Sequence, residues 1–124
     1  MVKLLRLRSW NTNADNLDEM VSFYQNVLGA SLEHSHTVGG VKVARMSLAG
    51  ATLGLFDASE GERPGVPHHT FDVEGEAGAE TLVKQLESTG VKVDHIRQHG
   101  DGPGYSLYVD DPSGNHIELS WDPT

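Results

Sequence analysis

The feature that most constrains the fold of this chain is an internal repeat of secondary-structure elements. Hydrophobic periodicity predicts a strand, a helix and three strands in about residues 1–57, and the same series again in residues 67–124. Gly29 and Gly90 take equivalent positions, each at the end of a predicted helix. Residues 58–66 are polar and rich in Gly and Pro, and are the expected linker. The pattern therefore predicts a single α+β domain over residues 1–124, built from two βαβββ units.

Aligning the two halves pairs further positions, although few of the paired residues are identical. The pairs are His34 with His95, Gly50 with Gly114, Gly54 with Glu118, and Ser9 with His68. Two βαβββ units can place their mixed sheets together as a curved half-barrel with the helices outside. The polar faces of the strands would then line the cavity of this half-barrel.

Capping and turn residues set the predicted boundaries of the elements. Asp15 or Asn16 is the expected N-cap of the first helix, which runs to about Leu28, and the second helix is expected over residues 76–89. The expected strands cover residues 4–13, 30–37, 41–48, 51–56, 67–73, 91–98, 105–109 and 115–121.

The composition excludes several classes of protein. The 124 residues include 18 acidic and 9 basic side chains, and the net charge of −9 argues against binding to nucleic acid. The absence of cysteine excludes a disulfide framework, a cysteine–zinc site and a cysteine nucleophile. No apolar run approaches about 18–20 residues and no signal peptide is recognised, so we expect a cytoplasmic protein without a membrane partner. The acidic balance provides solubility or steers a cationic ligand.

The principal candidate site lies between Asp111 and Trp121. A turn rich in Asp, Pro, Gly and Asn precedes a predicted strand whose side chains alternate between two faces. One face is apolar and is expected to pack on a helix. The other face carries the Glu118 carboxylate, flanked by His116. A carboxylate in this position is either solvated or functional.

A second predicted strand, over residues 67–73, has a matching polar face. His68 and Thr70 lie on this face, whereas Phe71 and Val73 lie on the side expected to face a helix. If both strands belong to one curved sheet, His68 and Glu118 point to the same concave side. An imidazole and a carboxylate in one cavity suit a divalent metal or general acid–base chemistry.

The remaining histidines are weaker candidates. His34 and His36, in the strand expected over residues 30–37, are expected on a solvated face that can also line the cavity. His69 is expected to pack under a helix. His95 and His99 flank the flexible loop over residues 99–104 and are expected to face solvent.

Three motifs make the chain similar to a known family. They are Phe23-Tyr24-Gln25-Asn26-Val27-Leu28-Gly29 at a helix end, His68-His69-Thr70-Phe71-Asp72-Val73, and Asp111-Pro112-Ser113-Gly114-Asn115-His116-Ile117-Glu118-Leu119. Together they resemble the vicinal oxygen chelate superfamily, which includes glyoxalase I, extradiol dioxygenases, fosfomycin resistance enzymes and bleomycin-resistance proteins. The resemblance covers essentially the whole chain and implies the paired βαβββ fold.

The resemblance also implies which residues would hold a metal. In metal-using members the ligands come from the first and last strands of each unit, and His68 and Glu118 occupy two of these positions. The other two positions hold Ser9 and Gly54. Glyoxalase I activity is therefore doubtful, and the His-His-Glu set of the fosfomycin enzymes and extradiol dioxygenases is incomplete.

Two further side chains can complete such a site. His116 lies two residues from Glu118 on the same face, and Asn11 lies two residues from Ser9 and offers an amide oxygen to a hard metal. A cavity-facing histidine is, however, more often a hydrogen-bonded wall residue. The ion would be divalent nickel, manganese, iron, cobalt or zinc. The sequence does not single out a general base.

Three hypotheses about function remain open at this point. The first is a small-molecule-binding protein of the superfamily with a variant divalent-metal site, which leaves open a metal-assisted lyase, isomerase or dioxygenase. The second is a metal-free, bleomycin-resistance-like protein that sequesters a cationic drug and so confers antibiotic resistance. The third is a partner-binding module without chemistry. The resemblance further implies a homodimer, in which the first strand of one subunit can face His68 and Glu118 of the other.

Overall fold

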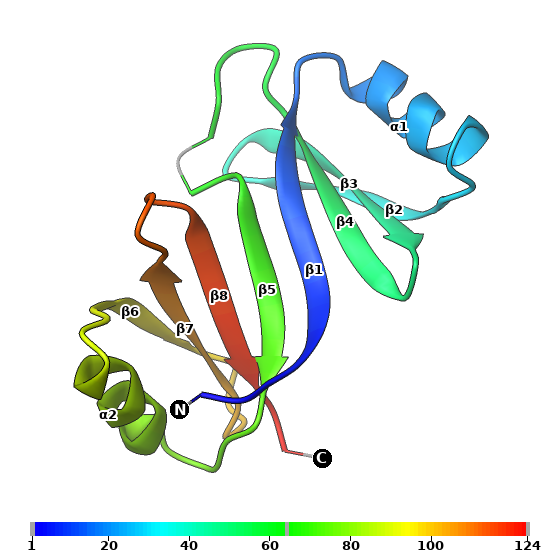
Figure 1. Ribbon diagram of the computed structural model, residues 1–124. Helices are drawn as coiled ribbons and strands as arrows, with labels where there is room; N and C mark the ends of the chain where they lie inside the picture. Colours follow the sequence, from blue (N-terminus) through cyan, green and yellow to red (C-terminus); the bar gives the residue numbers. More distant parts are fainter. Residues whose placement is uncertain (1, 64, 124) are drawn as a thin grey trace. The chain divides into compact units, whose positions relative to one another are not determined.

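The computed structural model describes residues 2–63 and 65–123 of the chain (Figure 1). Pro64, which belongs to the expected linker, and the two terminal residues of the expected domain lie outside the described residues. The contacts divide the chain into two compact units. We call Arg8–His68 the N-terminal unit, and Met1–Leu7 together with His69–Thr124 the C-terminal unit. The expectation of a single domain over residues 1–124 stays a prediction.

The N-terminal unit contains one helix and four strands. They are β1 (Leu4–Ala14, whose first residues belong to the other unit), α1 (Leu17–Asn26), β2 (Ser31–Val38), β3 (Val41–Leu48) and β4 (Ala51–Asp57). The strand order is β2-β3-β4-β1, with β1 parallel to β4 and the other neighbours antiparallel. Asn16 caps α1 as predicted, because its side-chain oxygen accepts the amide of Glu19 at 3.2 Å. Gly29, with φ at +73°, follows the helix.

The sheet of the N-terminal unit buries apolar side chains on both faces. On the helix-covered face Leu53 and Leu55 are fully buried and pack with Trp10 and with side chains of α1. On the other face a smaller cluster forms around Val43 and Phe56. One apolar cluster therefore packs the sheet against α1, and the other packs it against Val66 in the loop that follows β4.

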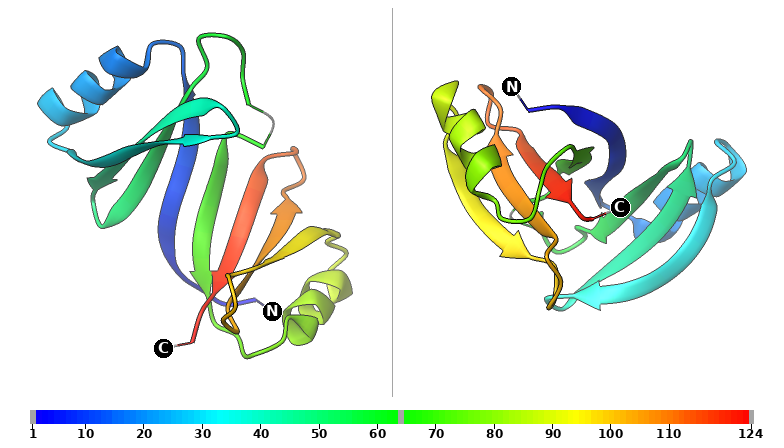
Figure 2. Two further views of the ribbon diagram at one scale, coloured as in Figure 1. Left: turned by 180° about the vertical axis from the view of Figure 1, so that it is seen from behind. Right: turned by 90° about the horizontal axis from the view of Figure 1, so that it is seen from below.

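The C-terminal unit repeats the series. It contains β5 (His68–Val73, whose first residue belongs to the other unit), α2 (Glu80–Ser88), β6 (Val93–Gln98), β7 (Tyr105–Asp110) and β8 (His116–Trp121). The strand order is β5-β8-β7-β6, and the start of β1 adjoins β5, where the Glu74 amide donates to the Lys3 carbonyl at 3.0 Å. Figure 2 shows α2 beside β6 and β7. Leu107, Leu119 and the α2 residues Leu82 and Leu86 form the core between sheet and helix.

Helix α2 begins four residues later than predicted. The expected start at residue 76 is replaced by an irregular segment up to Glu80. Gly78 in this segment has a φ of +87°, which a right-handed helix does not allow. The other predicted elements occur with boundaries within about two residues of the expected ones.

The strand registers confirm the internal repeat. Gly54 of β4 lies opposite Arg45, and Glu118 of β8 lies opposite Tyr108. The second strand of each unit has an irregularity at the same place, before His34 in one and before His95 in the other. The predicted equivalences of His34 with His95 and of Gly54 with Glu118 are thus confirmed, as is the α+β class with mixed sheets. No helix within the described ranges is long and apolar enough to cross a membrane.

The core of the N-terminal unit gives a first prediction. Leu53→Ala removes a side chain with 0% exposure from beneath α1, so we expect the free energy of unfolding to fall by about 2–5 kcal/mol. Val27 is 65% exposed and serves as the control. Val27→Ala should change the free energy of unfolding by less than about 0.5 kcal/mol. Urea denaturation measures both, and equal effects would contradict the assignment of the core.

Candidate functional site

The turn before β8 positions the strand that carries Glu118. The Asp111 carboxylate accepts the amides of Ser113 and Asn115 at 3.0 and 2.9 Å, and its second oxygen accepts the Asn115 side-chain amide at 2.9 Å. The hydrogen bonds from Asn115 hold the pKa of Asp111 below its ordinary value. The charged form of Asp111 therefore stabilises the turn.

Glu118 is the centre of a polar cluster on the face of the C-terminal sheet that does not contact α2. The residue is only 8% exposed. Its Oε1 accepts the hydroxyl of Thr70 at 3.2 Å, and its Oε2 accepts the hydroxyl of Ser106 at 2.7 Å. Glu118 is therefore buried and hydrogen-bonded, and the solvated alternative does not apply.

A guanidinium group balances the charge of this carboxylate. Arg97 of β6 donates from Nη2 to Glu118 Oε2 at 3.3 Å and from Nε to the Tyr108 hydroxyl at 2.9 Å. The hydrogen bond to Tyr108 is the main cause that raises the pKa of Arg97, and the Glu118 carboxylate adds to it. Burial raises the pKa of the Tyr108 phenol. The cluster thus pairs the buried Glu118 carboxylate with a guanidinium whose side chain is 56% exposed, and a neutral tyrosine lies beside them.

His99 belongs to the same cluster, contrary to the expectation that it faces solvent. Its Nε2 lies 2.8 Å from Ser106 Oγ, and its Nδ1 lies 2.9 Å from Asp122 Oδ1. Its side chain is only 19% exposed. The prediction was wrong because the loop over residues 99–104 folds back, with the His99 amide donating to the Gly104 carbonyl at 2.9 Å.

A second polar cluster lies in the N-terminal unit around His68. The Nδ1 of His68 lies 3.0 Å from the Gly65 carbonyl, which can only accept, so Nδ1 carries the proton. The Nε2 of the ring then accepts from Asn11 Nδ2 at 2.8 Å. Both ring nitrogens of His68 are therefore engaged by groups of its own unit.

Arg45 fixes the orientation of this asparagine. It donates from Nη1 to Asn11 Oδ1 at 2.8 Å, so the Asn11 amide nitrogen faces His68. The Nε of Arg45 donates to His36 Nε2 at 3.0 Å. Burial, followed by the positive charge of Arg45, lowers the pKa of His36. Four side chains thus form a continuous hydrogen-bonded series from His36 to His68.

The absence of a side chain at Gly54 makes this series possible. A Cβ placed on Gly54 would clash with Asn11 Oδ1 and with Arg45 Nη1. The Arg45 guanidinium and the Asn11 amide therefore occupy the space directly above the Gly54 backbone. This is the position equivalent to Glu118 in the other unit.

The other predicted residues lie at the edges of the two clusters. Ser9 pairs with Thr52 in the β1–β4 ladder and lies two residues before Asn11, on the same face of β1. His116 is half-exposed, and its Nδ1 lies 2.7 Å from Asp110 Oδ1. His69 is exposed rather than packed under a helix, because it lies near the start of β5, before the strand residues that pack in the core. That His68 and Glu118 share one ligand stays a prediction, since they belong to different units.

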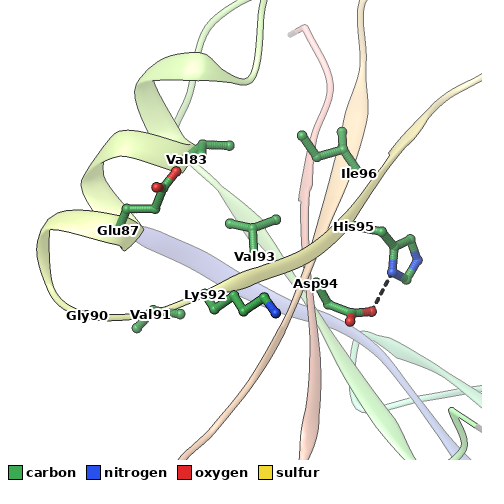
Figure 3. Close-up of a pocket in the computed structure, with 9 residues that line it drawn as sticks. All are labelled: Val83, Glu87, Gly90, Val91, Lys92, Val93, Asp94, His95 and Ile96. Carbon is green, nitrogen blue, oxygen red and sulfur yellow. Dashed lines mark hydrogen bonds and ion pairs between the residues drawn. The ribbon is translucent and has the colours of Figure 1, made fainter.

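A groove of about 660 Å³ lies apart from both clusters. It runs between α2 and β6, and its lining includes Val83, Glu87 and Ile96 (Figure 3). His95 also lines it, with its Nδ1 2.7 Å from Asp94 Oδ2. Neither Glu118 nor His68 lines this groove, so it is not part of the candidate site.

Comparison with known proteins places the chain in a family. The model of the Glyoxalase/Bleomycin resistance protein/Dioxygenase superfamily matches residues 7–119. The chain belongs to this superfamily. The resemblance that the three sequence motifs indicated is therefore confirmed.

Solved structures of superfamily members share the fold at low sequence identity. Methylmalonyl-CoA epimerase from Mycobacterium tuberculosis matches with a TM-score of 0.67 and 18% identity over 98% of this chain and 90% of its own. 2,2',3-Trihydroxybiphenyl 1,2-dioxygenase from Sphingomonas wittichii RW1 matches with a TM-score of 0.66 and 21% identity over 94% of this chain. The match spans only 42% of that dioxygenase chain. These similarities establish the fold alone.

Within each unit by itself, the described residues do not form a ligand set for the divalent ion that the superfamily resemblance implies. Neither unit, over residues 2–63 and 65–123, groups three His, Asp or Glu side chains that could hold a metal ion. In the N-terminal unit a guanidinium and an amide take the space at one ligand position, Gly54. In the C-terminal unit Arg97 already neutralises Glu118. In each cluster the protein itself provides the positive charge.

Sequence reasoning did not find Arg45, Arg97 or Ser106 as members of the clusters. Alternation in β3 would have placed Arg45 on the polar face, opposite to Ala44 and Met46. In β6 the irregularity before His95 changes the alternation, so Arg97 shares a face with Glu118 although Val93 faces the core. No sequence signal marks this irregularity.

The close approach over Gly54 gives a second prediction. Gly54→Ala places a methyl group against Asn11 and Arg45, so we expect a loss of about 1–3 kcal/mol in the free energy of unfolding through overpacking. Gly102→Ala is the matched control, because a Cβ there meets only the His99 carbonyl at an ordinary 3.6 Å. Urea denaturation compares the two, and a Gly54→Ala protein as stable as the control would show that the space is open.

The turn before β8 gives a third prediction. Because the folded pKa of Asp111 is lowered, its stabilising effect is complete above the unfolded value of about 3.9 and is lost as the pH falls through the folded pKa. Asp111→Ala should therefore lower the urea midpoint near neutral pH, and this difference should shrink below about pH 4. The exposed loop residue Asp101 provides the control variant Asp101→Ala. A difference for Asp111→Ala that does not depend on pH would contradict the role of the charge.

Proposed function

We propose that this chain is a small-molecule-binding protein of the superfamily whose polar clusters work without a divalent metal. The observation that carries the proposal is the placement of the Arg45 guanidinium and the Asn11 amide over Gly54. A guanidinium at this position repels a divalent cation, and the space needed by a ligand side chain is already filled.

The contacts of His68 support the same conclusion. A histidine binds a metal through an unprotonated nitrogen, which for His68 is Nε2. This atom accepts the Asn11 amide at 2.8 Å, and Arg45 prevents the amide from turning its oxygen to the ring. A metal at His68 would have to displace Asn11 and break the series of hydrogen bonds that includes Arg45.

The contacts of Glu118 support it independently. Its carboxylate accepts two hydroxyl groups and forms an ion pair with Arg97 at 3.3 Å. Glu118 is only 8% exposed, so removal of Arg97 would take a positive charge away from a buried carboxylate. A cation that displaced Arg97 would therefore have to compensate for the ion pair that it breaks.

A variant metal site at His68 and Glu118 is the second candidate. One observation favours it: the hydrogen bond from His68 Nδ1 to the Gly65 carbonyl sets the tautomer and ring orientation that metal-binding histidines use. This candidate corresponds to a metal-assisted lyase, isomerase or dioxygenase. It requires that these two residues, which belong to different units, bind one ion, as two subunits of a homodimer would allow.

The two candidates predict opposite metal contents, which gives the fourth prediction. Elemental analysis of natively purified protein, before and after dialysis against nickel, manganese, iron, cobalt or zinc, should find far less than one ion per chain. The matched variant is the double change His68→Ala and Glu118→Ala, which should leave the low metal content unchanged.

Near-stoichiometric metal that the double variant loses would overturn the metal-free proposal and establish the second candidate. Urea denaturation of the variant shows whether its fold is retained. The similar solved proteins named as an epimerase and a dioxygenase act on small molecules, which supports the ligand class in either case.

A further inference from the structure

Arg45 differs from Arg6 and Arg97 in having only neutral partners. Its Nε donates to His36 and its Nη1 donates to the Asn11 amide oxygen. Within the part of the chain that the structure describes, no carboxylate forms an ion pair with it. Arg6, by contrast, pairs with Asp72 at 2.6 Å, and Arg97 pairs with Glu118 at 3.3 Å. The positive charge of Arg45 is therefore not compensated by its immediate neighbours.

The surroundings of Arg45 are partly apolar, and a cation–π contact offsets only part of the loss of water. The guanidinium carbon lies 5.4 Å from the centre of the Phe56 ring, and Phe56 is only 5% exposed. Burial lowers the pKa of Arg45, which is the direction expected where a charge is partly removed from water without an anion beside it. Half-buried charges in proteins are generally paired, so an anion is the missing component.

The geometry leaves part of the guanidinium available to such an anion. Of its five N–H groups, two bond to His36 and Asn11, and these bonds hold the plane of the group. One N–H group on Nη1 and two on Nη2 remain, and these two terminal nitrogens can donate end-on to the oxygens of a carboxylate or phosphate. The ordering cost of the arginine side chain is already met by the protein, so less is lost when a ligand binds.

We propose that Arg45 is the anchor of an oxyanion-binding site in the N-terminal unit, taking the carboxylate or phosphate group of a small-molecule ligand. Asn11 and His36 act as positioning residues, and Gly54 provides the space in which the guanidinium lies. This inference rests on the metal-free function proposed above and assigns the chemical class of its ligand.

The net charge of −9 does not conflict with an anionic ligand. Exposed charges farther away than about 10 Å are largely screened at physiological ionic strength, whereas a half-buried guanidinium is screened much less. The acidic surface therefore slows the approach of an anion more than it weakens the bound state.

The test is a titration of metal-stripped protein with benzoate and, separately, with inorganic phosphate at constant ionic strength. The NMR signal of the Arg45 Nε–H group reports binding directly. We expect a saturable shift of this signal, and the probe that binds more tightly identifies the carboxylate or the phosphate as the natural group. Titration with bleomycin is the parallel arm for a cationic ligand.

Variants make the test specific. Arg45→Gln should weaken binding of the tighter probe at least about tenfold, because a charge-assisted pair is lost. Arg45→Lys keeps the charge without the fork and should bind with intermediate affinity. Arg6→Gln removes the same charge from an arginine that already has a carboxylate partner, and should bind as the unchanged protein does.

Several outcomes would overturn the inference. They are the absence of a saturable shift with both probes, equal affinity of Arg45→Gln and the unchanged protein, and saturable binding of bleomycin alone. If Arg45→Gln does not fold, the affinity of Arg45→Lys decides. Because the titration uses metal-stripped protein, a negative result overturns the oxyanion site only, whereas the proposed metal-free function depends on the separate elemental analysis.

Discussion

Each sheet of this protein has to bury one face against its own helix, and this requirement decides which side chains remain for the other face. In β4 the buried residues Leu53 and Leu55 face α1, so Gly54 between them belongs to the opposite side. In β8 Leu119 packs with α2, so Glu118 is turned away from the helix. The polar clusters therefore follow from the period of two along a strand combined with the position of the helix.

The two units use one backbone plan with different charges. Gly54 and Glu118 are equivalent positions, and Arg45 and Tyr108 are equivalent because they lie opposite these two residues. In the C-terminal unit a carboxylate from β8 meets a guanidinium from β6. In the N-terminal unit Gly54 takes the place of the carboxylate, and the guanidinium of Arg45 in β3 lies over this glycine. The first arrangement is electrically balanced, and the second has an excess positive charge.

The sequence predicted the fold more completely than the candidate site. Turn and capping residues such as Asn16 and Asp111 act through neighbours a few positions away, so their effects were visible in the sequence. The partners of Glu118 come from other strands, and the register that joins them depends on an irregularity before His95. His99 was misplaced because its contacts depend on the path of a loop rather than on alternation.

The sequence by itself determined the repeat, the order of its elements, the faces of β5 and β8, and membership of the superfamily, because these features depend on local periodicity and on contiguous motifs. Only the tertiary structure decided that Arg97 neutralises Glu118, and that Arg45 and Asn11 occupy the space over Gly54. Those contacts join residues 21 and 34 positions apart, and hydrogen bonds between distant side chains leave no periodic signal in a sequence.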